Sequence, residues 1–147
     1  MSQKNYQQNR MNMALIQRRN KRRQDEADRV VARGSCKTAE GMTYWSATAS
    51  GVLTVFGVGP FQPEAGVSPE IRHKIKFMIV SNGVTSIGPS ACRGMSQLRT
   101  VMLSKTVREI GPKAFRDCES LESISDLHNV LIGQKAFDDN KKARFLV

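Results

Sequence analysis

The second half of this 147-residue chain repeats itself at an interval of 23 residues. The segment from Val84 to Leu98 recurs from Val107 to Leu121, with Val, Ile, Gly, Pro, Ala, Arg and Leu at matching positions. A third, partial copy follows from Ile132, 22 residues after Ile110. One unit is too short to bury its own apolar side chains, so neighbouring units must stack. The sequence therefore predicts a short repeat solenoid over residues 75–140, in which β-strands alternate with short helical turns.

The turns of the predicted solenoid carry the motif Ile-Gly-x-x-Ala. Its glycines are Gly88, Gly111 and Gly133. We expect each glycine to supply a backbone turn at one corner, because glycine adopts conformations that other residues avoid. The residues that follow can open a short helical turn, with Phe115 pointing inward. Cys92 occupies the position in the first unit that Phe115 occupies in the second.

Residues 34–60 predict a β-hairpin head, since they are rich in Thr, Ser, Val and aromatic residues. Two β-rich runs, 43–48 and 52–56, flank a turn that contains Gly51. Trp45 and Phe56 are the expected core of this hairpin, which would cap the N-terminal end of the solenoid. Residues 61–74 are expected to form a loop, because the Pro and Gly residues between 60 and 70 exclude regular structure there.

Residues 1–33 form a basic arm. Residues 1–35 hold nine Lys or Arg against three Asp or Glu, which is +6 of the chain's total of +10. Residues 11–31 are good helix formers, but their apolar positions make only a broken stripe, so we expect a helix that needs a partner. Clustered Arg and Lys side chains are typical of a solvated, flexible tail or a nuclear-import signal, or of an arm that binds a polyanion, and we expect the last. The arm residues expected to bind it are Arg18, Arg19, Lys21, Arg22 and Arg23.

Residues 141–147 form a C-terminal tail that ends in Phe145, Leu146 and Val147. The last coil of a solenoid exposes an apolar face that must be covered. These three residues can fold back over that coil or dock into a neighbouring subunit. We expect docking, because the basic residues beside them would hold the tail away from the coil and a free apolar end is a liability in solution.

The composition also argues against several classes of protein. No run approaches the roughly 18 apolar residues of a membrane-spanning helix. Arg18 and Arg19 interrupt the apolar stretch that a secretory signal would need, so the chain is expected to remain inside the cell. Three cysteines without a CxxC spacing favour reduced thiols, and Cys36, Cys92 and Cys118 are interpreted as packing residues. We expect no cofactor, no metal, no membrane contact and no small-molecule substrate.

One nucleophilic set can be assembled on paper, from Cys118, His128 and Asp126, but Cys118 already has a packing role in the repeat. The segment Gly57–Gly59 lacks the third glycine of a dinucleotide-binding loop. Three further acids along a repeat surface are interpreted as a solvated edge: Asp117, Glu119 and Glu122. We therefore expect no enzymatic activity.

The repeat resembles the BspA-type leucine-rich repeat. The matching residues are Val107, Ile110, Gly111, Ala114, Phe115, Cys118 and Leu121. The resemblance reaches upstream to a Cys, a Trp, a hairpin and a Gly-x-Gly, which here are Cys36, Trp45, residues 51–55 and Gly57–Gly59. It covers residues 34 to about 140. What the resemblance implies is protein binding or adhesion without catalysis.

These features favour a non-catalytic structural or protein-binding subunit of a larger intracellular assembly, cytoplasmic or cytoskeletal. The solenoid would contact protein partners, and the arm would bind an acidic surface such as that of tubulin. An RNA-binding ribosomal or nuclear factor is an alternative, but Tyr6 is the only aromatic residue of the arm, and stacking on bases needs more. A surface adhesion protein whose secretion does not use an N-terminal signal is a further alternative.

Overall fold

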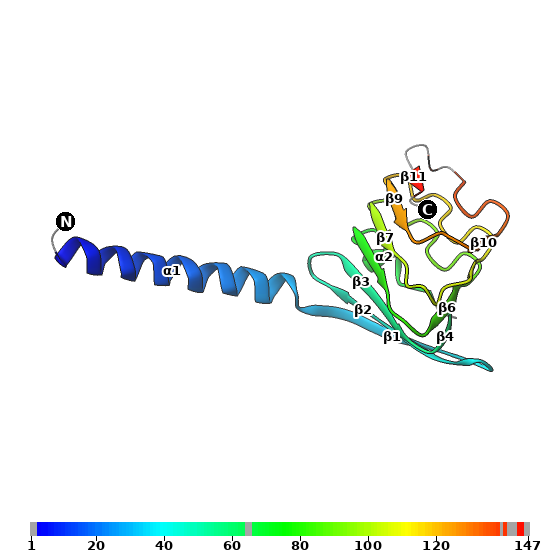
Figure 1. The fold of residues 1–147 in the computed structure, drawn as a ribbon, viewed down its shortest axis with the longest axis horizontal. Coiled ribbons are helices and arrows are strands. Elements are labelled where there is room, and N and C mark those ends of the chain that lie inside the picture. Colours follow the sequence, from blue (N-terminus) through cyan, green and yellow to red (C-terminus); the bar gives the residue numbers. More distant parts are fainter. Residues whose placement is uncertain (1–2, 64–65, 139, 141–143, 146–147) are drawn as a thin grey trace.

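The computed structural model describes residues 3–63, 66–138, 140 and 144–145. A long helix, α1 (Gln3–Ala27), leads into a β-solenoid of about three turns and stands clear of it (Figure 1). The large sheet of the solenoid contains β1 (Val30–Thr38), β2 (Gly41–Thr48), β3 (Val52–Gly57), β5 (Phe77–Val80), β7 (Thr100–Met102), β9 (Ser123–Ser125) and β11 (Arg144–Phe145), in that order. The small sheet contains β4 (Gly59–Phe61), β6 (Val84–Ile87), β8 (Glu109–Ile110) and β10 (Leu131–Ile132).

Successive coils stack in the register that the sequence repeat predicts. In the large sheet Phe77 pairs with Thr100, and Thr100 with Ser123, so each partner lies 23 residues further along the chain. In the small sheet Ile87 pairs with Ile110, and Ile110 with Ile132. All these pairs are parallel, as a coil that winds in one direction requires. The predicted repeat solenoid is confirmed.

The apolar interior lies between the two sheets. Ile87, Ile110 and Phe115 have no exposed surface, and neither have Leu98 and Leu121, which are equivalent positions of neighbouring units. Burying a side chain of this size stabilises a fold by about 1.5–3 kcal/mol. Backbone hydrogen bonds also link the turns of neighbouring coils: the N–H of Cys92 donates to the carbonyl of Ala114, and that of Phe115 to Ala136, both at 2.8 Å.

The hairpin head is the first coil of the solenoid. β1, β2 and β3 are antiparallel, while β3 pairs with β5 in parallel, so β3 passes the chain from the hairpin into the coils. Trp45 is buried, as expected, and its indole lies over Gly34, its cross-strand partner. A Cβ at Gly34 would lie only 2.6 Å from Cε2 of that ring.

The expectation that Phe56 belongs to the hairpin core is wrong. Its side chain is 43% exposed and stacks on Tyr44, with ring centroids 5.5 Å apart. Side chains alternate across a strand, and on β3 the inward positions belong to Leu53 and Val55, both without exposed surface. Phe56 must therefore face the opposite side of the sheet.

The helix of the arm lies further upstream than residues 11–31. α1 begins at Gln3 and ends at Ala27, because Val30 and Val31 belong to β1, where β-branched side chains are favoured. The end of α1 is attached to the turn between β2 and β3: the N–H of Ser50 donates to the carbonyl of Ala27 at 3.0 Å. No residue of α1 is buried.

The expected loop at 61–74 contains regular structure at both ends. Pro60 lies within β4. Proline has no amide hydrogen to donate, and β4 continues the small sheet without a hydrogen bond from that position. Pro69 opens α2 (Pro69–Arg72), where its fixed φ suits the first position of a helix. The guanidinium of Arg72 donates to the carbonyl of Val67 at 2.8 Å and closes this segment.

The repeat glycines serve close packing instead of the expected turn conformation. A Cβ at Gly111 would lie 2.7 Å from the backbone nitrogen of Pro89 in the preceding coil. The left-handed conformation of each turn falls two residues later, at Ser90, Lys113 and Lys135, with φ between 56° and 59°. Glycine is therefore needed at this corner because the backbones of two coils nearly touch.

Candidate interaction surfaces

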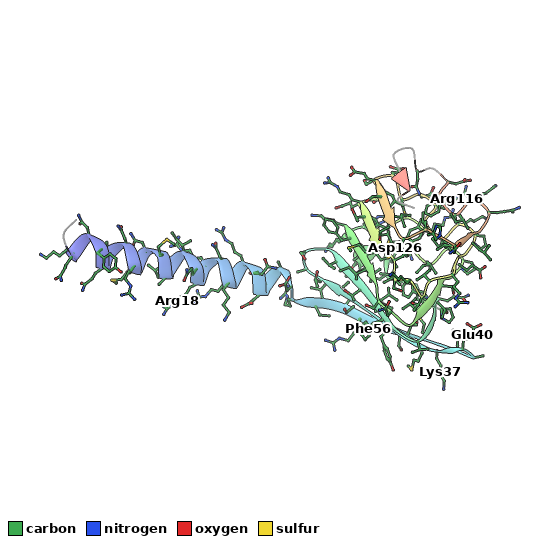
Figure 2. The ribbon with its side chains drawn as sticks, in the orientation of Figure 1. Arg18, Lys37, Glu40, Phe56, Arg116 and Asp126 are labelled. Carbon is green, nitrogen blue, oxygen red and sulfur yellow. The ribbon has the colours of Figure 1, made fainter. Side chains whose placement is uncertain are left out.

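The five basic residues predicted to bind a partner lie together on α1 and are all exposed. Figure 2 shows Arg18 on a part of the helix that stands away from the solenoid. Helical spacing places Arg18, Lys21 and Arg22 on one face, with Arg19 and Arg23 beside them. Among the described residues, none of these five side chains has a hydrogen-bond or ion-pair partner. The helix therefore presents a band of unneutralised positive charge.

Like charges repel one another within this band, although Asp25 and Glu26, four residues after Lys21 and Arg22, offset part of the repulsion. Arg18 and Arg22 are four residues apart, as are Arg19 and Arg23, and each such like-charge pair costs about 0.2–0.5 kcal/mol. The first turn of α1 has no acidic residue and the last turn has no basic one, so neither end gains from the helix dipole. An anionic partner would remove the repulsion between the basic side chains.

The tail is described only in part. The backbone of Arg144 and Phe145 forms β11, which pairs in parallel with Ser123 and Ile124 of β9. At these two residues the chain thus adds a strand to the last coil, as in the alternative in which the tail folds back. Leu146 and Val147 lie outside the described residues. Their role in binding a partner stays a prediction.

The structure does not bring the Cys118, His128 and Asp126 set together as a nucleophile and base. Cys118 has no exposed surface, whereas His128 and Asp126 are exposed. The thiol of Cys118 donates to the carbonyl of Cys92 at 3.2 Å, and no contact joins it to the imidazole among the described residues. Burial raises the pKa of Cys118 to about 12, so the thiolate that a nucleophile needs is disfavoured.

Cys92 and Cys36 are also buried free thiols. The thiol of Cys92 contacts the sulfur of Met78 at 3.6 Å. Burial raises the pKa of Cys92 well above its ordinary value. All three cysteines thus have the packing role that the sequence predicted.

His128 and Asp126 line a surface hollow of about 730 Å³ together with Lys105, Arg108 and Leu131. Within the described part of the chain, no group of three His, Cys, Asp or Glu side chains is placed to hold a metal ion. Asp117 is one of the three acids interpreted as a solvated edge. Its Oδ2 forms an exposed ion pair with Nε of Arg93 in the preceding coil, at 3.4 Å. Exposed pairs of this kind contribute little to stability.

The sequence did not identify the exposed aromatic side chains of the large sheet. Tyr44 and Phe56 face solvent, and so does Phe77 on β5. The alternation of β3 carried the signal for Phe56, because Leu53 and Val55 already claim the inward side. No helix among the described residues combines the length and apolarity needed to cross a membrane.

The stacked parallel coils define the class of this protein as a repeat solenoid. Residues 72–145 match the family described as BspA type leucine rich repeat region (6 copies). The match covers half of the chain, and the chain belongs to this family. Leucine-rich repeats of this kind generally act as non-catalytic modules of protein interaction.

Among solved structures, the chain is similar to a leucine-rich repeat protein from Eubacterium ventriosum ATCC 27560, with 25% sequence identity and a TM-score of 0.56. The similarity covers 69% of this chain but only 28% of that protein. A comparison with curated proteins gives no significant match.

Proposed function

We propose that this chain is a non-catalytic subunit of a larger intracellular assembly, in which the solenoid contacts protein partners and α1 attaches the subunit to an acidic protein surface. A cytoskeletal surface such as that of tubulin is the specific candidate. The observation that carries the proposal is the state of α1. It has 25 residues, none of them buried, and its basic cluster has no partner among the described residues.

The exposed helix α1 lacks the packing that keeps most helices ordered. In proteins, most helical stability comes from packing an apolar face against another element. Met11 and Leu15, the apolar residues nearest the cluster on one face, are 62% and 51% exposed. Binding to an acidic surface would cover them and neutralise the arginines. Tyr6 is the only aromatic residue of the arm, which favours an acidic protein over base stacking for α1.

Co-sedimentation of the full chain with purified microtubules tests the proposal. Replacing Arg18, Arg19, Lys21, Arg22 and Arg23 by Ala should weaken binding and flatten its dependence on salt, because fewer charges are neutralised in the complex. The thermal unfolding of the solenoid should not change, since none of these side chains contacts it. A matched control replaces five neutral arm residues by Ala: Gln7, Asn9, Gln17, Asn20 and Gln24.

The control variant should bind as the parent does. The role of the cluster would be refuted if the variant that lacks the five Arg and Lys side chains had the same affinity as the parent across a salt titration. Failure of the parent to sediment with microtubules would refute the cytoskeletal candidate. Soluble polyglutamate as a competitor then separates the two claims, because it reports on acidic partners in general.

A further inference from the structure

The solvent-facing side of the large sheet, called the outer face below, carries no negative charge. None of β1, β2, β3, β5, β7 and β9 contains an Asp or a Glu. Hydroxyl, apolar and aromatic side chains occupy the outward positions, together with Arg33 and Lys37 of β1. Figure 2 shows Phe56 and Lys37 on the side of this sheet that faces away from the solenoid interior. The chain has 13 acidic residues, and none of them lies on these six strands.

Three aromatic rings lie on the outer face. Tyr44, Phe56 and Phe77 are 40%, 43% and 46% exposed. Apart from Tyr6 of the arm, these are the only exposed aromatic residues in the described part of the chain. Each ring has apolar area left to bury against a ligand, at about 25 cal/mol per Å², and all three rings lie on one sheet.

Two of the three rings, those of Tyr44 and Phe56, form a stacked pair that is still about two-fifths exposed. Tyr44 and Phe56 are directly opposite each other on β2 and β3, with ring planes inclined by 24°. Ser35 of β1 lies beside Tyr44 in the same register row. Arg33 and Lys37 lie two residues to either side of Ser35, and neither has an ion-pair partner among the described residues.

We propose that the outer face binds a single-stranded nucleic acid, with bases stacking on Tyr44 and Phe56 and phosphates contacting Arg33 and Lys37. Flat rings beside basic side chains on an open sheet are what single strands require, because every base offers a π-face and every linkage a negative charge. The basic cluster of α1, which is joined directly to β1, would add long-range attraction. The inference rests on the outer face and shares only the long-range attraction of the basic cluster with the protein partner proposed for the arm.

A protein partner is the competing occupant, since Ile79 and Met102 are also exposed on this face. The two occupants differ in what they need from Tyr44 and Phe56. A protein interface uses the apolar area of these residues, which leucine also supplies. Stacking uses the ring itself, so leucine cannot replace it.

The test measures fluorescence anisotropy of the full chain with labelled oligouridine of about 20 nucleotides. An oligothymidine and a duplex of the same length distinguish RNA, DNA and paired strands as the ligand. We expect binding to the single strands and weaker binding to the duplex, whose bases are not free to stack. Replacing both Tyr44 and Phe56 by Leu should lower the affinity for single strands by about tenfold or more.

Two further variants keep the test decisive. Tyr44→Phe retains the ring and should bind as the parent does, whereas Met102→Ala removes a side chain of the same face that is 55% exposed and should also have no effect. Thermal unfolding of each variant confirms that it is folded. The proposal is overturned if the parent does not bind single strands, if it prefers the duplex, or if the double Leu variant binds as tightly as the parent. The variant with the five basic residues of α1 replaced by Ala is measured in the same way. If only that variant loses binding, the nucleic acid contacts α1 and the outer face does not bind it.

Discussion

The arm and the solenoid differ in how far their side chains are buried. In the solenoid, a side chain such as Ile110 has no exposed surface because the coils before and after it supply equivalent apolar residues. In α1, 25 residues in succession have no buried member. The stacking of equivalent residues stabilises the solenoid alone, whereas α1 has its own backbone hydrogen bonds, exposed side-chain hydrogen bonds such as that from Gln8 to Asn12, and the bond from Ser50 to Ala27. We therefore expect that substitutions in one part leave the stability of the other part unchanged.

The largest effect on stability is expected from a substitution at the centre of the solenoid. Phe115 has no exposed surface and stacks on Phe137 with ring centroids 5.6 Å apart. Phe115→Ala should lower the free energy of unfolding by about 3–5 kcal/mol, through lost burial and a cavity. Chemical denaturation measures this change. Leu15→Ala in α1 is the matched control and should change the free energy by no more than about 0.5 kcal/mol; similar losses for both would erase the contrast between the regions.

A smaller effect is expected where two coils touch. Gly111→Ala would place a Cβ 2.7 Å from the nitrogen of Pro89 and 2.9 Å from the carbonyl carbon of Gly88. Because both neighbours are backbone atoms, the coils must move apart, at a cost of about 1–3 kcal/mol. Lys113→Gly, at φ 59°, is the control and should change the stability by no more than about 1 kcal/mol in either direction. Full stability of Gly111→Ala would show that the close approach of the two coils does not require glycine at this corner.

The smallest effect is expected from the arm. Deleting residues 1–24 should change the free energy of unfolding of the solenoid by no more than about 0.5 kcal/mol and leave its midpoint in place, because no residue of α1 is buried. The hydrogen bond from Ser50 to Ala27 survives this deletion. Circular dichroism should show the loss of helical signal alone. A clear drop in the midpoint would mean that the arm stabilises the solenoid after all.

The repeat made the coils predictable from sequence. An interval of 23 residues placed Ile87 beside Ile110, and burial followed from the same alignment, since equivalent positions share their surroundings. It also placed Cys92 and Cys118 inside, so the thiol of the Cys118, His128 and Asp126 set lies away from the surface. Where each unit has a neighbour, local pattern and tertiary packing give the same answer.

The exposed features were harder to predict, because apolar character alone does not say which side of a sheet a residue faces. Phe56 was assigned to the core by its hydrophobicity, although its parity with Leu53 and Val55 placed it outside. The glycines were assigned to a turn conformation because single-chain reasoning cannot see the backbone of the adjacent coil, which is what excludes a side chain at Gly111. The partner proposed for the arm lies outside the chain, so no pattern within the sequence identifies it.

The direct junction between α1 and β1 has a mechanical consequence. The two elements run in nearly the same direction (Figure 1), and β1 is paired with β2 from Val30 to Thr38. A pull applied through the helix therefore acts along β1, across hydrogen bonds that lie perpendicular to the strands. Such a load is shared by the whole ladder at once and does not open it one bond at a time. The longest strand of the molecule thus serves as the anchor through which tension on the arm would reach the solenoid.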